Sequence, residues 1–268
     1  MANTTYIVNL GNDRTNITPL VVEMKGGASD LAALDFTIRE AHAGGGLVKT
    51  IIFFNTRDLA YRAYRHLKEL LPDEYKTKID FLHSMRGDST KRRVMQQFRD
   101  NEVSILCATE AAGMGLDIGD IRRVIQFMVP TSLSQWLQRY GRAGRDGRPA
   151  IAILLIEQSV FKKVKPRGAK QGEDDDGDDA PPAEEDSAGA DAMEDLVGGE
   201  DATSGADGGP IPASNTKVYQ KRVEDGLRQW LETTDCRRTA ANKYFENPRC
   251  ATSECPVQAL TLRLTMAI

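Results

Sequence analysis

The sequence predicts an α/β fold with a single parallel sheet, followed by an acidic insert and a small helical tail. Short apolar runs alternate with amphipathic stretches from about residue 47 to 166, as repeated strand–helix units do. From Gln171 to Thr216 the chain has fifteen Asp and Glu and neither Lys nor Arg. Such a segment buries too little apolar surface to fold. The predicted regions are a lead-in (1–46), the α/β lobe (47–166), a disordered acidic insert (167–216) and the helical tail (217–268).

Each element of the lobe is predicted from its apolar pattern. Five strands are expected, at Lys49–Phe54, Ile79–Leu82, Val103–Ala108, Arg123–Met128 and Ala150–Ile156. The expected helices are Arg57–Leu71, Asp88–Phe98 with Asp88 as its cap, and a helix that Ser132 caps and that ends at Tyr140. The lead-in is interpreted as extended chain, at Thr5–Asn9 and Leu20–Met24, and then a helix from Ser29 to His42. In the tail a helix is expected from Val218 to Thr233.

The charge of the chain is unevenly distributed. Without the fifteen acids of the insert, 35 Lys and Arg stand against 24 Asp and Glu, so the remainder carries +11 rather than −4. A basic surface favours partners with phosphate backbones. No apolar run reaches about eighteen residues and no signal-peptide pattern is present, so we expect no membrane partner. Cys107 is expected to be a small buried residue, and the cysteine pattern favours reduced thiols or a metal over disulfides.

Two arginines, Arg142 and Arg145, lie three residues apart among glycines in the stretch Gln138–Gly147. Small neighbours let the backbone approach a ligand, and each planar guanidinium can bind two phosphate oxygens at once. About thirty residues upstream, Ala108–Asp117 has the pattern of a buried strand that opens into a Gly-rich turn. Backbone N–H groups in such a turn can bind an anion. The two segments together predict a polyphosphate site.

These two segments resemble motifs V and VI of superfamily 2 helicases, and Gly141–Gly147 resembles the RecQ type in particular. Asp13–Ile17 is similar to an Arg-x-Asn-Ile element that RecQ-like proteins carry between their two motor lobes. The resemblance covers about residues 48–164 and, in part, 218–255. It implies a single RecA-like lobe, the second motor lobe of an ATP-dependent 3′-to-5′ DNA helicase. It further implies DNA single strands and duplex junctions as partners, and a nuclear location.

By this resemblance, Arg142 and Arg145 act as arginine fingers on the γ-phosphate of ATP, which a first lobe in cis or in trans holds with Mg²⁺. The two arginines should then not be buried in internal ion pairs and turned away from the open edge of the sheet. The implied nucleotide contacts are Gln138, Gly115 and Asp117, and the implied nucleic-acid contacts are Thr56, Arg57, Ser84, Thr109 and Gly113. Asp117 could equally be a helix cap, and Asp146 could either orient an arginine or cap a turn.

The tail carries cysteines in an order that resembles the zinc-binding module following the motor lobes of RecQ-type helicases. Cys236 opens a helix with two arginines, Tyr244 and Phe245 end it, and Cys250 and Cys255 follow. Three sulfurs are thus present for a tetrahedral Zn²⁺ site, and no Cys or His follows the last of them. A three-Cys site with a water and a tail that has lost one ligand are both compatible with this pattern.

The sequence shows neither a P-loop nor an Asp-Glu pair at the end of an apolar strand. The nearest candidate, Gly44–Thr50, has Val48 where a glycine must precede the lysine, and it precedes a strand instead of following one. We therefore expect no ATP hydrolysis by this chain alone. The alternatives are a non-catalytic nucleic-acid-binding remnant, the lobe of a DEAD-box RNA helicase, and a product without a stable fold. The acidic insert is either a phosphate mimic or a solvated linker.

Overall fold

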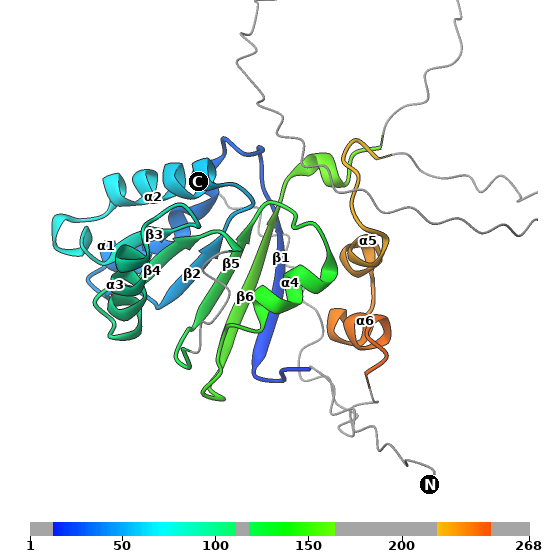
Figure 1. The fold of residues 1–268 in the computed structure, drawn as a ribbon. Coiled ribbons are helices and arrows are strands. Elements are labelled where there is room, and N and C mark those ends of the chain that lie inside the picture. Colours follow the sequence, from blue (N-terminus) through cyan, green and yellow to red (C-terminus); the bar gives the residue numbers. More distant parts are fainter. Residues whose placement is uncertain (1–12, 111–117, 164–218, 248–268) are drawn as a thin grey trace, which may run out of the picture. The chain divides into compact units, whose positions relative to one another are not determined.

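Parallel strands form one sheet, and helices cover both of its faces (Figure 1). The structure is a computed structural model that describes residues 13–110, 118–163 and 219–247. Its strands are β1 (Ile17–Glu23), β2 (Thr50–Phe53), β3 (Ile79–Leu82), β4 (Ile105–Ala108), β5 (Arg123–Phe127) and β6 (Ala150–Ile156). The strand order is β1-β6-β5-β2-β4-β3, and all of these neighbours pair in parallel. The predicted α/β class with a single parallel sheet is confirmed.

The helices divide between the two faces of the sheet. They are α1 (Arg39–His42), α2 (Arg57–Leu70), α3 (Asp88–Arg99), α4 (Leu133–Tyr140), α5 (Asp225–Glu232) and α6 (Arg237–Tyr244), with 3-10 turns at Leu31–Ile38, Asp73–Tyr75 and Gln158–Val160. On one face, α1, α2 and the first 3-10 turn bury apolar side chains against the sheet. On the other face, α3 and α4 do the same, and α5 and α6 pack against that layer. Each face therefore has its own apolar core.

The edge strand β1 differs from the expectation for the lead-in. Residues 1–46 were expected to precede the sheet, but Ile17–Glu23 pairs along its whole length with Ala150–Ile156 of β6. Pro19 lies within this strand, where it has no N–H to donate. An edge strand tolerates a proline because one side of it needs no ladder partner. The lobe therefore begins well before residue 47.

Two helix boundaries also differ from the sequence-based expectation. The stretch from Ser29 to His42 was expected as one helix, but residues 31–38 form 3-10 turns and only Arg39–His42 is α-helical. The hydroxyl of Thr37 donates to the carbonyl of Leu34 at 2.8 Å, a local bond that competes with regular helix geometry. In α3, the N-cap is Gly87, and Asp88 is the first helical residue, where its charge suits the helix dipole.

The first tail helix is shorter than expected. Instead of spanning Val218 to Thr233, α5 starts at Asp225, because the carboxylate of Glu224 caps it by accepting from the N–H of Leu227 at 3.2 Å. Ahead of the cap, Tyr219 forms an isolated antiparallel bridge with Lys163. In the part of the chain that the structure describes, no helix is long and apolar enough to span a bilayer.

Candidate functional site

The loop that carries Arg142 and Arg145 follows α4. The hydroxyl of Ser132 caps this helix by accepting from the N–H of Gln135 at 3.1 Å, as predicted. The helix runs back from the carboxyl end of β5, and the loop therefore lies near the amino ends of the strands. There, the N–H of Gly144 donates to the carbonyl of Ile121 at 2.8 Å, two residues before β5. Residues 141–147 are called the arginine loop below.

The lead-in fixes the backbone of the arginine loop. The side chains of Arg14 and Asn16 both donate to the carbonyl of Gly144, each at 2.7 Å, and the Asn16 amide also donates to the carbonyl of Arg148 at 2.9 Å. Gly144 has a φ of +51°, and a Cβ there would lie 2.6 Å from the Asn16 amide nitrogen. The position accepts only glycine without rearrangement. The Arg-x-Asn-Ile element thus acts as a clamp on the arginine loop.

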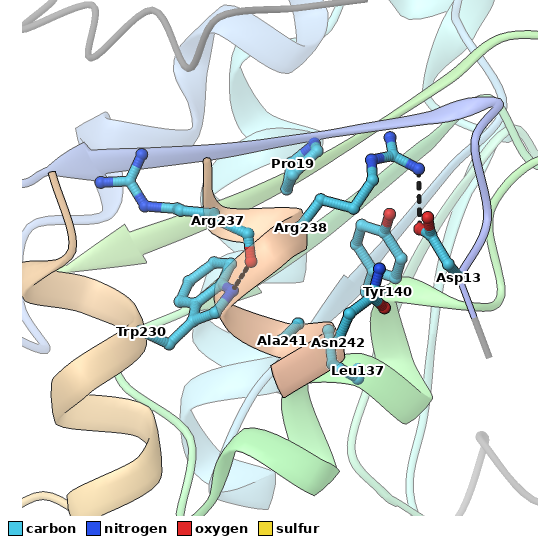
Figure 2. Close-up of a pocket in the computed structure, with 9 residues that line it drawn as sticks. All are labelled: Asp13, Pro19, Leu137, Tyr140, Trp230, Arg237, Arg238, Ala241 and Asn242. Atoms are coloured by element: carbon cyan, nitrogen blue, oxygen red, sulfur yellow. Dashed lines mark hydrogen bonds and ion pairs between the residues drawn. The ribbon is translucent and has the colours of Figure 1, made fainter. Parts of the chain in front are cut away.

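The tail in turn holds the lead-in, as Figure 2 shows. Arg238 of α6 forms an ion pair with Asp13 at 2.8 Å and donates to the carbonyl of Ile17 at 3.0 Å. The hydroxyl of Tyr140, from α4, donates to the same Ile17 carbonyl at 3.3 Å. Side-chain contacts therefore connect helix α6 to the lead-in and the lead-in to the arginine loop. These contacts join residues that are far apart in the sequence.

The electrostatics of the arginine loop favour an anion. Arg145 is exposed and Arg142 is half-buried. Burial lowers the pKa of the Arg142 guanidinium, the adjacent Arg145 lowers it further, and Glu110 acts in the opposite direction. The two like charges repel each other, and a bound polyphosphate would offset this repulsion. Gln138, one turn earlier, is exposed as well.

Asp146 both orients an arginine and caps a turn, the two roles that the sequence left open. Its carboxylate forms an ion pair with Arg122, in which Nη1 and Oδ1 are 2.9 Å apart. It also accepts from the N–H of Arg148 at 3.1 Å. The bond with Arg122 holds the pKa of Asp146 well below its usual range. The arginine that it orients is thus outside the predicted finger pair.

A second group of predicted residues lies at the carboxyl ends of the strands. Thr56, Arg57 and Ser84 are exposed, whereas Thr109 is 9% exposed. The hydroxyl oxygen of Thr56 caps α2 by accepting from the N–H of Leu59 at 3.3 Å. A capping hydroxyl keeps its own hydrogen as a donor for a phosphate. Thr56, Arg57 and Ser84 follow the carboxyl ends of β2 and β3, whereas the backbone of the arginine loop lies near the amino end of β5.

Gly113, Gly115 and Asp117 fall in the segment 111–117, outside the described residues. Cys250 and Cys255 likewise lie outside them, in 248–268. Cys236 is half-buried at the N-cap of α6. Among the described residues, no three His, Cys, Asp or Glu side chains form a group that could hold a metal ion. The zinc site therefore stays a prediction.

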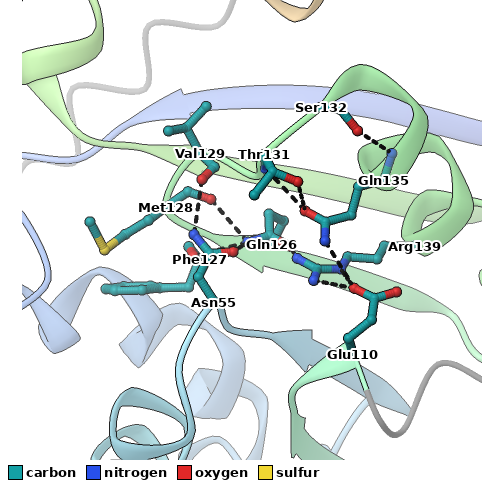
Figure 3. Close-up of polar contacts among 10 residues, drawn as sticks. All are labelled: Asn55, Glu110, Gln126, Phe127, Met128, Val129, Thr131, Ser132, Gln135 and Arg139. Atoms are coloured by element: carbon teal, nitrogen blue, oxygen red, sulfur yellow. Dashed lines mark hydrogen bonds and ion pairs between the residues drawn. The ribbon is translucent and has the colours of Figure 1, made fainter. Parts of the chain in front are cut away.

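Sequence reasoning missed a polar network centred on Arg139 of α4, which Figure 3 shows. Arg139 is only 3% exposed. Its Nε donates to Glu110 at 3.1 Å, its Nη2 forms an ion pair with the same carboxylate, and its Nη1 donates to the side chain of Gln126. Gln126 donates on to Asn55 at 3.3 Å. The network joins Asn55, Glu110 and Arg139, which are next in sequence to the predicted site residues Thr56, Thr109 and Gln138.

A signal for this network was present in the sequence. Trp136, Arg139 and Tyr140 are three and four residues apart, so the arginine lies on the same helical face as two aromatic residues. Both aromatic side chains are buried in the core, with ring centroids 6.0 Å apart. A charged side chain on the core face of a helix needs a partner that compensates its charge. The identity of that partner, Glu110, depends on the fold and not on local spacing.

Comparison with known proteins agrees with this geometry. Residues 37–147 match the helicase conserved C-terminal domain. The probable ATP-dependent DNA helicase RecS of Bacillus subtilis is 36% identical over 112 residues, which are 42% of this chain and 22% of that protein. ATP-dependent DNA helicase RecQ of the same organism is 31% identical over 154 residues, which are 58% of this chain and 24% of that protein.

RNA helicases are similar to this chain as well. The mitochondrial DEAD-box ATP-dependent RNA helicase 9 of Arabidopsis thaliana is 35% identical over 124 residues, which are 46% of this chain and 19% of that protein. A solved structure of Mss116p DEAD-box helicase domain 2 bound to an RNA duplex aligns with a TM-score of 0.47 and 21% identity, over 55% of this chain and 56% of that chain. The chain spans less than a quarter of the length of the curated relatives named here.

The parallel sheet and the family match at residues 37–147 identify a helicase C-terminal domain. Within that class, its sequence is similar to RecQ-like helicases.

Proposed function

We propose that this chain acts as the second motor lobe of an ATP-dependent 3′-to-5′ DNA helicase. In this proposal, Arg142 and Arg145 contact the γ-phosphate of ATP, which a first lobe holds together with Mg²⁺. Negative charge that develops on the transferred phosphoryl group is stabilised by fixed guanidiniums without further reorganisation. Thr56, Arg57, Ser84 and Thr109 contact the backbone of one DNA strand. Gln138 lies on the nucleotide side.

One observation carries the proposal: Arg142 and Arg145 lie three residues apart on a clamped backbone. Repulsion between Arg142 and Arg145 contributes to the lowered pKa of Arg142. The bonds from Arg14 and Asn16 to Gly144 fix the backbone between the two arginines. A flexible loop would let the side chains separate, whereas a fixed one keeps them ready for an anion. In this proposal, Thr56 and Arg57 at the carboxyl end of β2 contact DNA, whereas the arginine loop contacts ATP.

The test is a fusion in which the first lobe of Bacillus subtilis RecQ precedes this chain. We expect Arg145→Ala and Arg142→Ala each to reduce ATP turnover by about a thousandfold or more, the lower range measured for arginine fingers. The affinity for a fluorescein-labelled oligothymidylate should stay within about twofold, because the arginine loop is far from the strand-binding residues. Arg148→Ala is the matched control, since it removes an exposed arginine just beyond the same loop. Turnover that survives Arg145→Ala would show that the finger is assigned wrongly.

The substrate could instead be RNA, as it is for the DEAD-box relative. We favour DNA because the stretch Gly141–Gly147 and the Cys-Arg-Arg order at Cys236 resemble the RecQ type. Competition between single-stranded DNA and RNA of the same sequence distinguishes a DNA substrate from an RNA substrate. Preferential displacement of the labelled oligothymidylate by RNA would contradict the DNA assignment.

We further propose that Cys236, Cys250 and Cys255 bind Zn²⁺ in the tail. Thiolates are the preferred zinc ligands in structural sites, and Cys236 begins α6, which contacts the lead-in through Arg238. Metal analysis of the freshly purified chain should give about one equivalent of zinc. Less than about half an equivalent would argue against the site.

A further inference from the structure

A cluster of aromatic side chains lies at the outer edge of the sheet, where α2 packs over β3. Tyr61 and Tyr64 of α2 contact Phe81 of β3, with ring centroids 5.2 and 4.9 Å apart. His83, just after β3, has its ring centroid 5.6 Å from that of Phe81. We call these four residues the aromatic surface. The strand order makes β3 an edge strand, so the surface borders solvent.

Part of this surface is open. Tyr61 is 43% exposed, and Met85, two residues after His83, is 72% exposed. The N–H of Met85 donates to Nδ1 of His83 at 3.2 Å, which holds the turn against the aromatic surface. Exposed large apolar side chains that are grouped together mark a binding surface more often than scattered ones do.

Cations surround the aromatic surface. The guanidinium of Arg86 lies 4.3 Å from the ring centroid of Phe81, and the amine of Lys68 lies 5.2 Å from that of Tyr64. Burial lowers the pKa of His83, and Arg57, Arg86 and Lys91 lower it further, so the local potential is positive. Nearby carboxylates offset part of this charge through ion pairs.

How easily each of these cations can bind a phosphate depends on how exposed its ion pair is. Asp80 pairs with Arg86 at 2.9 Å, with both side chains largely buried. Asp88 pairs with Lys91 at 3.3 Å, and Asp58 with Arg62 at 3.7 Å, and both of these carboxylates are exposed. Exposed pairs are weak and exchange readily with other ions. We therefore expect a phosphate to contact Arg57, at the first position of α2.

We propose that the aromatic surface binds the bases of single-stranded nucleic acid, with Tyr61 and Met85 in contact with the bases and Arg57 beside the phosphates. Arg57 and Tyr61 are one helical turn apart on the same face of α2. Ser84 lies between His83 and Met85, so the aromatic surface continues directly from two predicted strand-binding residues. An exposed ring beside cations suits a strand whose bases are unpaired, since any base can stack on a ring. The inference rests on the proposed nucleic-acid binding and extends it from backbone to base contacts.

The experiment measures the affinity of the full chain for a fluorescein-labelled oligothymidylate at several salt concentrations. Tyr61→Leu should weaken binding about fivefold or more, which corresponds to the lower range for base–aromatic stacking. The salt dependence should not change, because no phosphate contact is removed. Tyr61→Phe keeps the ring and should bind like the unchanged protein. Tyr244→Leu is the matched control, because Tyr244 of α6 is 42% exposed but lies in the tail.

A second probe is an oligonucleotide of the same length without bases. It should bind the unchanged protein and Tyr61→Leu equally, since it offers phosphates alone. The inference is overturned if Tyr61→Leu binds oligothymidylate as well as Tyr61→Phe does, or if Tyr244→Leu weakens binding as much. If the unchanged protein binds oligothymidylate at no salt concentration, the proposed nucleic-acid function fails together with this inference. Binding that Tyr61→Leu leaves intact overturns this inference alone.

Discussion

Gly144 has the most constrained position in the arginine loop. Its positive φ is unfavourable for other residues, and three atoms surround the place where a Cβ would be: the Asn16 amide nitrogen at 2.6 Å, the Arg148 carbonyl oxygen at 2.8 Å and the Ala150 Cβ at 3.0 Å. Gly147, three residues later, has a φ of +81° but open space around it. A substitution at Gly147 would therefore meet backbone strain alone, whereas one at Gly144 would meet both backbone strain and a steric clash.

We expect Gly144→Ala to lower the free energy of unfolding by about 2 kcal/mol or more, because strain and displacement of the clamp add together. Gly147→Ala should cost only the strain, about 1 kcal/mol. Urea unfolding of both variants measures the difference. Equal losses for the two variants would mean that the clamp moves aside without cost.

Tyr140 gives the fold a dependence on alkaline pH. Burial raises the pKa of Tyr140 to about 12, above its ordinary value of 10.0. Below pH 10 both the folded and the unfolded chain keep the proton, so the stabilisation is complete. Between pH 10 and 12 the unfolded chain loses the proton first. The folded state is therefore stabilised less as the pH rises, by up to about 1.4 kcal/mol per pH unit.

Tyr140→Phe should remove this part of the pH dependence. At neutral pH the variant loses the hydrogen bond to Ile17, so its free energy of unfolding should be about 1 kcal/mol lower. Above pH 10 its stability should fall less steeply than that of the unchanged protein. Urea unfolding in a pH series tests this, and parallel curves for the two proteins would refute it.

At the scale of elements, α4 is fixed to the sheet by Arg139 as well as by its apolar face. The guanidinium carries a charge into the core and lies 5.3 Å from the ring centroid of Phe53 on β2. Its partner Glu110 is 48% exposed in its side chain, so water can replace part of a lost contact. The pair links the helix before the arginine loop to the end of β4.

Glu110→Ala should lower the free energy of unfolding by about 1.5–3 kcal/mol, the range for hydrogen bonds to charged groups. Arg139→Met in the same chain should recover much of that loss, because no unpaired charge is left in the core. The control is Glu69→Ala, which breaks an exposed pair with Arg65 and should cost less than about 0.5 kcal/mol. A double-mutant cycle without coupling would show that the ion pair contributes nothing.

The sequence predicts those elements whose signal is local. Strand β6 has the predicted bounds, and α4 has the predicted cap and end, because apolar runs and a capping serine are visible in the sequence. Strand β1 was missed because Pro19 and half-buried positions weaken its pattern, and only pairing with β6 makes it a strand. Arg142 and Arg145 are only three positions apart, so their pairing is visible in the sequence. Arg139 and Glu110 are 29 positions apart, so their contact is not.

At the scale of the whole molecule, the lobe and the tail share one core. Leu227, Trp230 and Leu231 of α5 belong to the same apolar cluster as α4, and the rings of Trp136 and Trp230 are 6.3 Å apart. The carboxylate of Glu224 accepts from the N–H of Leu133 at 2.8 Å, so the residue that caps α5 also contacts the first turn of α4. Loss of the tail would expose apolar surface of the lobe.

We therefore expect the lobe and the tail to unfold in one cooperative transition. Trp136→Phe leaves Trp230 as a fluorescent reporter of the tail, and Trp230→Phe leaves Trp136 as a reporter of the lobe. The first change removes an indole N–H that has no hydrogen-bond partner among the described residues, whereas the second breaks a bond to the carbonyl of Arg237. Trp230→Phe should therefore be less stable by about 1 kcal/mol. In each variant, the urea midpoint from fluorescence should equal that from circular dichroism.

Separate midpoints would mean that the tail is an independent unit, and the contact of Arg238 with the lead-in could then not support the arginine loop. The absence of any cooperative transition would instead favour a product without a stable fold. If there is a single transition, destabilising α6 would also loosen Asp13–Ile17. The side chains that hold the carbonyl of Gly144 would then be less well fixed. Hydrogen exchange tests this link: Arg238→Ala should accelerate exchange of the Gly144 amide, which donates to Ile121, while the amides of β3 stay protected.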